Sequence, residues 1–242
     1  SFQPTLKESR MLTNYNGSYD AISTLAHELG HAYHGYTIKD HRPLNQSYSM
    51  PVAETASTFN ETHLTLHMYE QAESTEEKLS ILDNYLTGAG QTIVDILSRF
   101  VFEKTVFERV QETYLDEAAL KEIMLEAQRF AYGEAVQEEH LHPYMWACKG
   151  HYYSTGRSFY NFPYAFGQLF SAGLYRRYQE EGADFMPVYA ELLKETTVSS
   201  VEDTAAAAGI DLSKPDFWEA SFEMLEELVD SYEQLVKEMT DA

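Results

Sequence analysis

The sequence has few of the features that would indicate a secreted, nucleic-acid-binding or membrane protein. Its 242 residues include one cysteine, Cys148, which excludes an internal disulfide and suits a reducing compartment such as the cytoplasm. Only 17 basic residues stand against 39 acidic ones, and the formal net charge of −22 argues against nucleic acid and anionic membranes as partners. The apolar runs are far too short to span a bilayer, and no signal peptide opens the chain.

Alternating apolar and polar residues, which would indicate strands, are nearly absent outside residues 10–16. We also find no internal repeat, low-complexity tract or linker, and no indication of the oligomeric state. The pattern therefore predicts a mainly α fold, a single helical domain over residues 1–242 with at most a short β-strand or hairpin near residues 10–16. The predicted helices cover residues 18–36, 51–70, 75–116 with a break at Gly88 and Gly90, 117–139, 158–181, 183–195, 201–208 and 215–239.

The most informative stretch is His27-Glu28-Leu29-Gly30-His31, which reads H-E-x-x-H. It lies in the helix predicted over residues 18–36, with Ser18 as N-cap and an end near Gly35. The two histidines are one helical turn apart on one face, so both imidazoles reach one cation. Glu28 is placed to take a proton from a water that the cation polarises. This arrangement is typical of a zinc hydrolase.

A third ligand is sought downstream, because a catalytic zinc commonly takes three protein ligands and leaves a further position for water. Pro51 suits the first turn of a second helix, and Glu54 and Glu61 lie two turns apart on one of its faces. The apolar residues around them argue for burial, and a buried carboxylate needs a partner. We predict Glu54 as the third ligand of one Zn²⁺ per chain. We predict Glu61 as the hydrogen-bond acceptor that fixes the tautomer of a ligand histidine.

At this point the chain resembles a known family. HELGHAYH, from His27, and PVAETASTFNE, from Pro51, resemble the oligoendopeptidase F group of the M3 zinc metallopeptidases. Residues 11–17 resemble the strand and turn before the family's zinc helix, and residues 90–107, 129–133 and 159–167 also have counterparts. The resemblance covers nearly the whole chain. It implies a helical catalytic domain with one zinc ion, which hydrolyses short peptides at internal bonds.

Members of this family are longer and carry an N-terminal helical lobe that walls the other side of the cleft. This chain begins at Ser1, a short way before the predicted zinc helix. The resemblance therefore leaves three interpretations open. The chain is a fragment that lacks the lobe, a processed product, or a genuinely short form.

The resemblance also points to a second cluster late in the chain. The family places a histidine and tyrosines opposite the zinc, where they donate hydrogen bonds to the oxyanion of the tetrahedral intermediate. His151 is the best match for that histidine, and Tyr160 and Tyr164 are the best matches for the tyrosines, with Tyr153 behind them. Because residues 154–157 look like an insertion, the register of the tyrosines stays open. Packing in the core is the alternative role for these aromatic residues.

The remaining histidines have structural interpretations. His34 lies one turn beyond His31 on the zinc helix, which favours a supporting role near the site. His63 and His67 have ligand-like spacing, but no glutamate follows His63, and this favours a packed or solvated helix face.

Taken with the resemblance, these residues predict a cytoplasmic zinc endopeptidase that acts on short oligopeptides. A strand at residues 10–16 would bind the peptide backbone by strand addition. The first alternative is a carboxypeptidase or dipeptidase of the same class, which needs a basic group for the substrate's C-terminal carboxylate. Arg157 is the obvious basic residue in the second cluster. The second alternative is a non-catalytic peptide-binding domain, and Glu28 argues against it because a structural zinc site has no use for a base.

Overall fold

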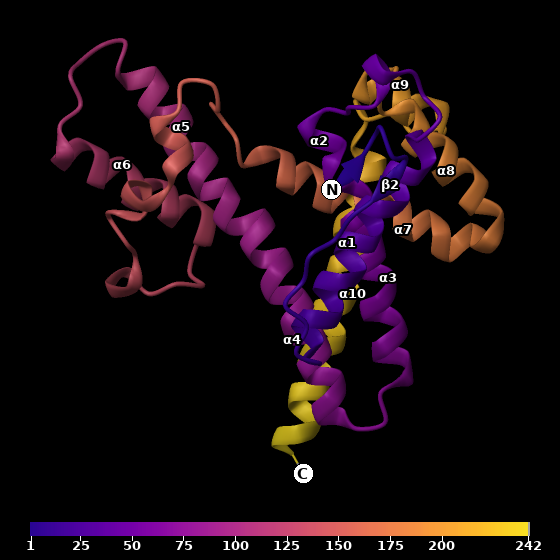
Figure 1. The fold of residues 1–242 in the computed structure, drawn as a ribbon. Coiled ribbons are helices and arrows are strands. Elements are labelled where there is room, and N and C mark those ends of the chain that lie inside the picture. Colours follow the sequence, from indigo (N-terminus) through magenta and orange to yellow (C-terminus); the bar gives the residue numbers. More distant parts are fainter. Residues whose placement is uncertain (242) are drawn as a thin grey trace. The chain divides into compact units, whose positions relative to one another are not determined.

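The computed structural model describes residues 1–241, and within that range the fold is mainly helical, as the sequence predicts (Figure 1). A two-stranded antiparallel sheet is the only sheet in the described part of the chain. No helix among the described residues is both long and apolar enough to cross a membrane. The chain forms two compact units. Unit 1 comprises Ser1–Gly88 and the described residues from Phe166 on, and unit 2 comprises Ala89–Ala165.

The helices follow the predicted series with several shifted ends. Unit 1 is built from α1 (Tyr19–Ile38), α2 (Met50–Ala53), α3 (Thr55–Gln71), α4 (Thr75–Gly90), α7 (Phe162–Glu181), α8 (Phe185–Glu195), α9 (Val201–Ala207) and α10 (Pro215–Thr240). Unit 2 contains a π-helical turn (Gln91–Asp95), α5 (Ile96–Arg109), α6 (Glu117–Tyr132) and three short 3₁₀ turns (Glu138–His140, Met145–Cys148, Gly150–Tyr153). The last residues of α4 and the first of α7 cross the boundaries between the units.

Several predicted helix boundaries were wrong. The helix predicted to end at residue 116 ends at Arg109, and the helix predicted from residue 158 begins at Phe162. Three further differences involve particular residues. The first helix runs past Gly35 to Ile38, and Gly35 is instead a point of close contact, where an added Cβ would lie 2.8 Å from the Phe2 ring. The helix predicted to end at residue 139 ends at Tyr132, where Gly133 adopts a φ of +54° that a helix does not continue. The helix predicted over residues 51–70 is interrupted at Glu54.

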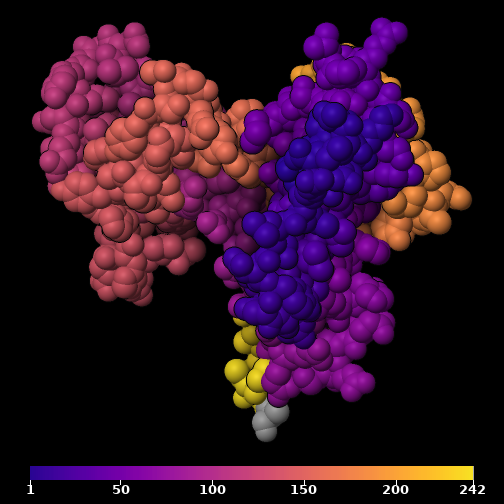
Figure 2. Space-filling view, in the orientation of Figure 1, coloured from indigo at the N-terminus to yellow at the C-terminus, as the bar shows by residue number. Residues whose placement is uncertain are grey.

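The hairpin lies earlier than predicted. Phe2–Gln3 pairs with Glu8–Ser9 as β1 and β2, whereas residues 10–16 form no strand and lead directly to α1. This N-terminal segment, drawn in indigo, lies at the surface of unit 1 (Figure 2). The prediction of a strand at residues 10–16 was therefore wrong, whereas pairing of this segment with a peptide backbone stays a prediction. Alternation shows that a segment is extended, but strand pairing needs a partner, and here the partner segments are both upstream.

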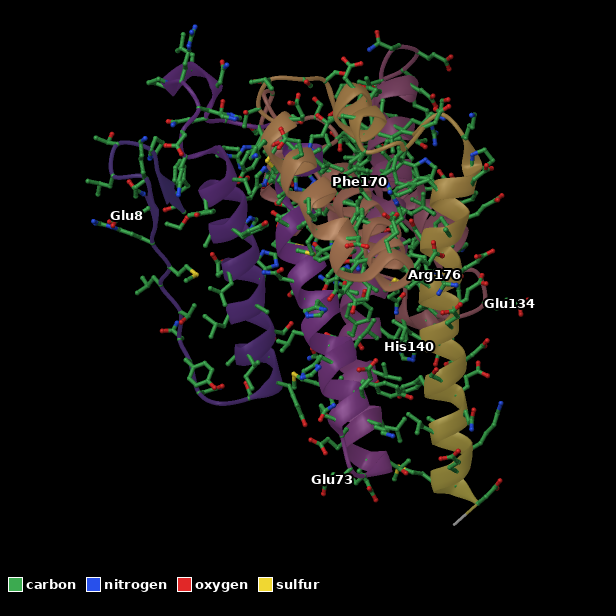
Figure 3. All side chains as sticks on the ribbon, turned by 90° about the vertical axis from the view of Figure 1, so that its right-hand side faces the viewer. Glu8, Glu73, Glu134, His140, Phe170 and Arg176 are labelled. Carbon is green, nitrogen blue, oxygen red and sulfur yellow. The ribbon has the colours of Figure 1, made fainter. Side chains whose placement is uncertain are left out.

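The core of unit 1 is rich in aromatic side chains. Phe59 from α3, Phe170 from α7 and Tyr189 from α8 are buried, and the rings of Phe59 and Tyr189 stack with centroids 4.4 Å apart. Figure 3 shows Phe170 inside the bundle and Arg176, further along α7, beside α10. Each such ring contributes roughly 1.5–3 kcal/mol of hydrophobic stabilisation. This core fixes α1, α3 and α7, the three helices around the site described next.

Unit 2 has its own smaller core. The helices α5 and α6 pack against each other around Phe102, Ile123 and Met124, all buried. At the start of α5, Asp95 pairs with Arg99 and accepts a hydrogen bond of 2.7 Å from the Tyr132 hydroxyl. The segment after α6 crosses this helix pair with short turns and little regular structure.

Candidate metal centre

The two histidines of the H-E-x-x-H motif lie one turn apart on α1, as predicted. Ser18 is the N-cap of this helix, and its hydroxyl accepts a hydrogen bond of 3.2 Å from the Ala21 amide. The Nε2 atoms of His27 and His31 are 3.1 Å apart, and both side chains are half-buried. Glu28 is also half-buried, and its carboxylate has no hydrogen-bond or ion-pair partner within residues 1–241. A carboxylate without a partner beside two converging imidazoles is available to take up a proton.

Gly30, inside the motif, sets the distance between α1 and α3. A Cβ at this position would lie 2.2 Å from the carbonyl oxygen of Ala56 on α3. The two helices therefore approach closely enough for backbone to meet backbone, which only glycine allows. This contact brings the first turn of α3 next to the histidine face of α1.

Glu54 lies at the junction between α2 and α3. Its φ of −93° and ψ of 0° interrupt the helix for one residue. Its backbone carbonyl accepts the first hydrogen bond of α3, from the Thr58 amide at 3.0 Å. Its carboxylate oxygen Oε2 is 2.9 Å from the hydroxyl of the buried Ser57. On the other side, a Cβ added to Gly167 of α7 would lie 3.0 Å from the Cβ of Glu54. The carboxylate is thus held by its local backbone and by close packing.

Three donor atoms from these residues converge. Glu54 Oε2 lies 3.3 Å from His27 Nε2 and 3.3 Å from His31 Nε2. Ligand atoms about 2.0–2.2 Å from a tetrahedral zinc ion lie roughly 3.3–3.6 Å from one another. Within residues 1–241 this is the one group of three or more such side chains placed to hold a metal ion. Two imidazoles and one carboxylate, so spaced, fit a catalytic zinc that keeps a position open.

The electrostatics of the group also fit a cation. Burial lowers the pKa of His27, but its contacts with Glu54 and Glu61 outweigh burial and raise that pKa well above the usual imidazole range. Burial raises the pKa of Glu54, but the contacts with His27 and His31 outweigh it and hold that pKa well below its usual range. The arrangement therefore stabilises positive charge between the imidazoles and the carboxylate.

Glu61 lies behind His27, on the far side of its ring. Its Oε2 is 3.3 Å from His27 Nδ1, and its Oε1 is 3.3 Å from the hydroxyl of Ser23, one turn earlier on α1. An acceptor at Nδ1 leaves Nε2 of the same ring free to bind a metal ion. Glu61 thus contacts the histidine beside which it was predicted, while its role in supporting a metal ligand stays a prediction. Ser23 is an additional partner that the spacing in the sequence did not reveal.

His34 is buried in a separate environment. Its Nε2 lies 2.8 Å from the Thr196 hydroxyl and 3.2 Å from the Leu193 carbonyl, and its ring stacks on Tyr48 with centroids 3.9 Å apart. Burial lowers its pKa to about 4. His34 is a neutral packing residue that joins α1 to α8 and to the loop before α2. His63 packs against Tyr175 and Tyr178 of α7, in agreement with its structural interpretation.

The predicted late cluster lies in unit 2, where three of its members come together. The hydroxyls of Tyr160 and Tyr164 are 2.9 Å apart, and the ring of His151 lies 5.8 Å from that of Tyr160. Burial lowers the pKa of His151. Tyr153 differs, because its ring is exposed and its hydroxyl donates to the Ala147 carbonyl. Arg157 lies with its guanidinium 5.6 Å from the centroid of the Tyr160 ring.

Sequence reasoning missed the residues that position the ligands. Gly30 and Gly167 allow close approach, and Ser57 and Ser23 contact the carboxylates of Glu54 and Glu61. Small residues flanking a ligand were the available signal, but glycine and serine are too common for such a signal to be specific.

Comparison with known proteins gives a consistent set of matches. The model of peptidase family M3 matches residues 3–224. The group B oligopeptidase PepB of Streptococcus agalactiae is 29% identical over 93% of this chain and 37% of its own length. The oligopeptidase PepF of Bacillus subtilis is 28% identical over 93% of this chain and 34% of its own length. The chain thus spans about a third of the length of the curated relatives that it matches.

Two crystal structures share the fold. A putative peptidase from Chlamydophila abortus superposes with a TM-score of 0.82 at 26% identity, covering 92% of this chain and 37% of that one. An oligoendopeptidase-F from Enterococcus faecium superposes with a TM-score of 0.76 at 24% identity, covering 90% of this chain and 40% of that one. At this identity the second match supports the fold alone.

Proposed function

Because the chain belongs to peptidase family M3, we propose that it carries the catalytic centre of a zinc peptidase that hydrolyses short oligopeptides at internal bonds. The observation that carries the proposal is the spacing of the three donor atoms from His27, His31 and Glu54. The oligopeptidase names of the matched relatives support the substrate class. The single cysteine supports a cytoplasmic location, where it would stay reduced.

The contacts support the metal-binding roles. His27 and His31 would hold one zinc ion through Nε2, and Glu54 would hold it through Oε2, which accepts from the Ser57 hydroxyl. Glu61 accepts from Nδ1 of His27 and so keeps the lone pair of Nε2 toward the ion. When bound, zinc supplies Lewis-acid chemistry, polarising a water and the carbonyl of the scissile peptide bond.

Glu28 carries the proton. Its carboxylate takes the proton from the attacking water and later passes it to the leaving amine, as a general base and then a general acid. The absence of any partner for this carboxylate among residues 1–241 supports the role, because no ion pair has to break first.

His151, Tyr160 and Tyr164 are the donors to the oxyanion that forms when water adds to the carbonyl. The contact of 2.9 Å between the two tyrosine hydroxyls supports a shared target, since two donors to one oxygen must lie close together. Burial lowers the pKa of His151, which favours the neutral ring, and this ring donates through an N–H.

A carboxypeptidase or dipeptidase remains the second candidate, because Arg157 lies beside Tyr160. A guanidinium there would bind the free carboxylate at the end of a substrate. Cleavage of one peptide as the free acid and as its C-terminal amide distinguishes the two. Equal rates support internal cleavage, and strong preference for the free acid supports the second candidate.

The test of the main proposal combines metal analysis with cleavage of a mixed peptide library. We expect about one zinc per chain and cuts at internal bonds, with activity lost on chelation and restored by added zinc. Full activity in a preparation without metal would overturn the proposal, and so would bound zinc without any peptide cleavage.

A further inference from the structure

Unit 2 contains a cavity from which the proposed zinc chemistry uses one lining residue, His151. It has a volume of about 310 Å³ and lies between α5 and residues 151–158. This is near the lower end of the range for small-molecule sites, on the order of 300–1,000 Å³, so it suits one side chain better than a long peptide. The lining residues are Phe102, Glu103, Val106, Phe107, Val110, His151, Tyr152, Tyr153, Ser154, Thr155 and Ser158.

The walls of the cavity are largely apolar and aromatic. Phe102 is buried, whereas Phe107, Val110 and Tyr153 are exposed. Apolar walls suit the methylene stem of a long side chain, and aromatic rings also attract a cationic head over their faces. The shape and composition thus fit a residue that is apolar along its length and charged at its tip.

Glu103 supplies the opposite charge. This residue is only 8% exposed, and burial raises the pKa of its carboxyl. Its one partner within residues 1–241 is the Phe159 amide, which donates to Oε1 at 2.8 Å. A carboxylate accepts up to about four hydrogen bonds, so most of its capacity is unused. Arg99, one turn earlier on α5, is already paired with Asp95.

A buried carboxylate without a cation is costly, and native structures usually compensate for such a charge. The contact with Phe159 has a structural role of its own, because Phe159 has a φ of +54° and the bond holds it in that conformation. One amide does not neutralise the charge. Glu103 therefore has no cationic partner among residues 1–241, and it lines the cavity from which a cation can reach it.

We propose that this cavity binds an arginine or lysine side chain of the peptide substrate, with its cationic head at Glu103 and its stem along the aromatic wall. The inference rests on the proposed function. His151, a proposed oxyanion donor, lines the same cavity, so a side chain bound there belongs to a residue close to the scissile bond. The cavity would make the peptidase selective for basic residues at one substrate position.

The test compares peptides that carry arginine or its neutral isostere citrulline, moved one position at a time along an octapeptide. At one position we expect the wild-type protein to favour arginine by about 10-fold or more in kcat/KM, as a charged hydrogen bond does. Glu103→Gln should bring that ratio close to one, because the amide oxygen still accepts from Phe159 while the charge is removed. Glu108→Gln is the matched control, an exposed glutamate on the same helix that pairs with Lys104.

A second variant guards against misfolding of Glu103→Gln. Ser158 is exposed and lines the cavity, so Ser158→Lys places a competing cation there without disturbing the core. It should reduce the arginine preference as strongly as Glu103→Gln. An unchanged ratio in folded Glu103→Gln or in Ser158→Lys would overturn the inference, as would a wild-type ratio near one at every position.

A binding measurement separates this inference from the proposed function. The probe is Nα-acetyl-arginine amide, and its binding to the full chain is followed by ligand-observed NMR. We expect binding that weakens about 10-fold or more in Glu103→Gln and Ser158→Lys. Probe binding without peptide cleavage would leave the cavity assignment standing and overturn the peptidase proposal. Peptide cleavage without probe binding would support the peptidase proposal and overturn the cavity assignment.

Discussion

The two units hold their chemical groups in different ways. In unit 1 the donor atoms of His27, His31 and Glu54 come from packed helices, and close backbone contact at Gly30 sets their spacing. In unit 2 His151 and Tyr160 lie on short turns, and the orientation of that segment depends on a few contacts such as that of Glu103 with Phe159. A metal ion tolerates little error in ligand position, which favours helices. The residues that we propose as oxyanion donors, His151 and Tyr160, lie on a segment with fewer backbone constraints.

The largest expected effect comes from breaking the centre of unit 1. Glu54→Ala should lose zinc and all peptidase activity, since it removes one of three ligands. Glu61→Ala should keep zinc but weaken its binding by about 10–100-fold, because it removes only the acceptor behind His27. Zinc affinities measured by competition with a chelator check both variants. The reverse order of affinities would exchange the two roles.

The next effect separates metal binding from chemistry within unit 1. Glu28→Gln should retain one zinc per chain and lower turnover by about 10²–10⁴-fold, because it removes the base and no ligand. Metal content and kcat are measured on the same sample. Turnover near that of the wild type would remove Glu28 from the mechanism.

A similar test applied to unit 2 sharpens the comparison. His151→Ala should lower kcat and kcat/KM together by about 10²–10³-fold with zinc retained, as the loss of an oxyanion donor does. Tyr160→Phe and Tyr164→Phe, measured beside it, identify which hydroxyl shares the role. Release of zinc from His151→Ala would make His151 a ligand. An unchanged kcat would make it a packing residue.

A smaller effect concerns the stability of unit 1 and its dependence on pH. The folded pKa of His34, about 4, is below the value of about 6.5 in an unfolded chain, so the folded state binds fewer protons. The contribution of neutral His34 to the free energy of unfolding is fully present above pH 6.5. It decreases by about 3 kcal/mol as the pH falls toward 4. Urea unfolding in the presence of a chelator should show this decrease, and His34→Gln should flatten it. If the free energy of unfolding depends on pH equally in the wild type and in His34→Gln, the low pKa does not belong to His34.

The smallest effect contrasts two glycines of unit 1. Gly30→Ala should destabilise the protein by about 1–3 kcal/mol, since the new Cβ meets the Ala56 carbonyl at 2.2 Å. Gly88→Ala should stabilise it by up to about 1 kcal/mol, because this exposed helical position has nothing within 4 Å. Thermal unfolding of the two variants checks both signs. If the two variants behave alike, close contact at Gly30 is not what sets the spacing.

Local signals in the sequence predicted the parts of unit 1 that depend on local chemistry. Ser18 is the N-cap of α1, and the turn between His27 and His31 brings their ring nitrogens together. The break at Glu54 escaped prediction, because Pro51 and the residues after it are compatible with a continuous helix. The break lies where Glu54 packs closely against Gly167 of α7, a tertiary contact that no local pattern records.

The same reasoning explains the weaker predictions elsewhere. Residues 10–16 have a strand-like pattern, but no strand lies beside them, and the hairpin forms from Phe2 to Ser9. In unit 2 the resemblance led to Tyr160 and Tyr164, which come together, and also to Tyr153, whose hydroxyl contacts Ala147. Which of these tyrosines come together depends on the path of the chain through its short turns, and the sequence pattern does not give that path.

The close approach at Gly167 has a consequence for genetics. Gly167 has no side chain to bind a metal ion, carry a proton or form a hydrogen bond, yet any larger side chain at this position presses first on Glu54. A saturation library selected for zinc retention would therefore show intolerance on α7, a helix without a single metal-binding residue. Such a mutational map, taken alone, would suggest a chemical role for Gly167. The glycine is needed only because a methyl group at this position would displace Glu54.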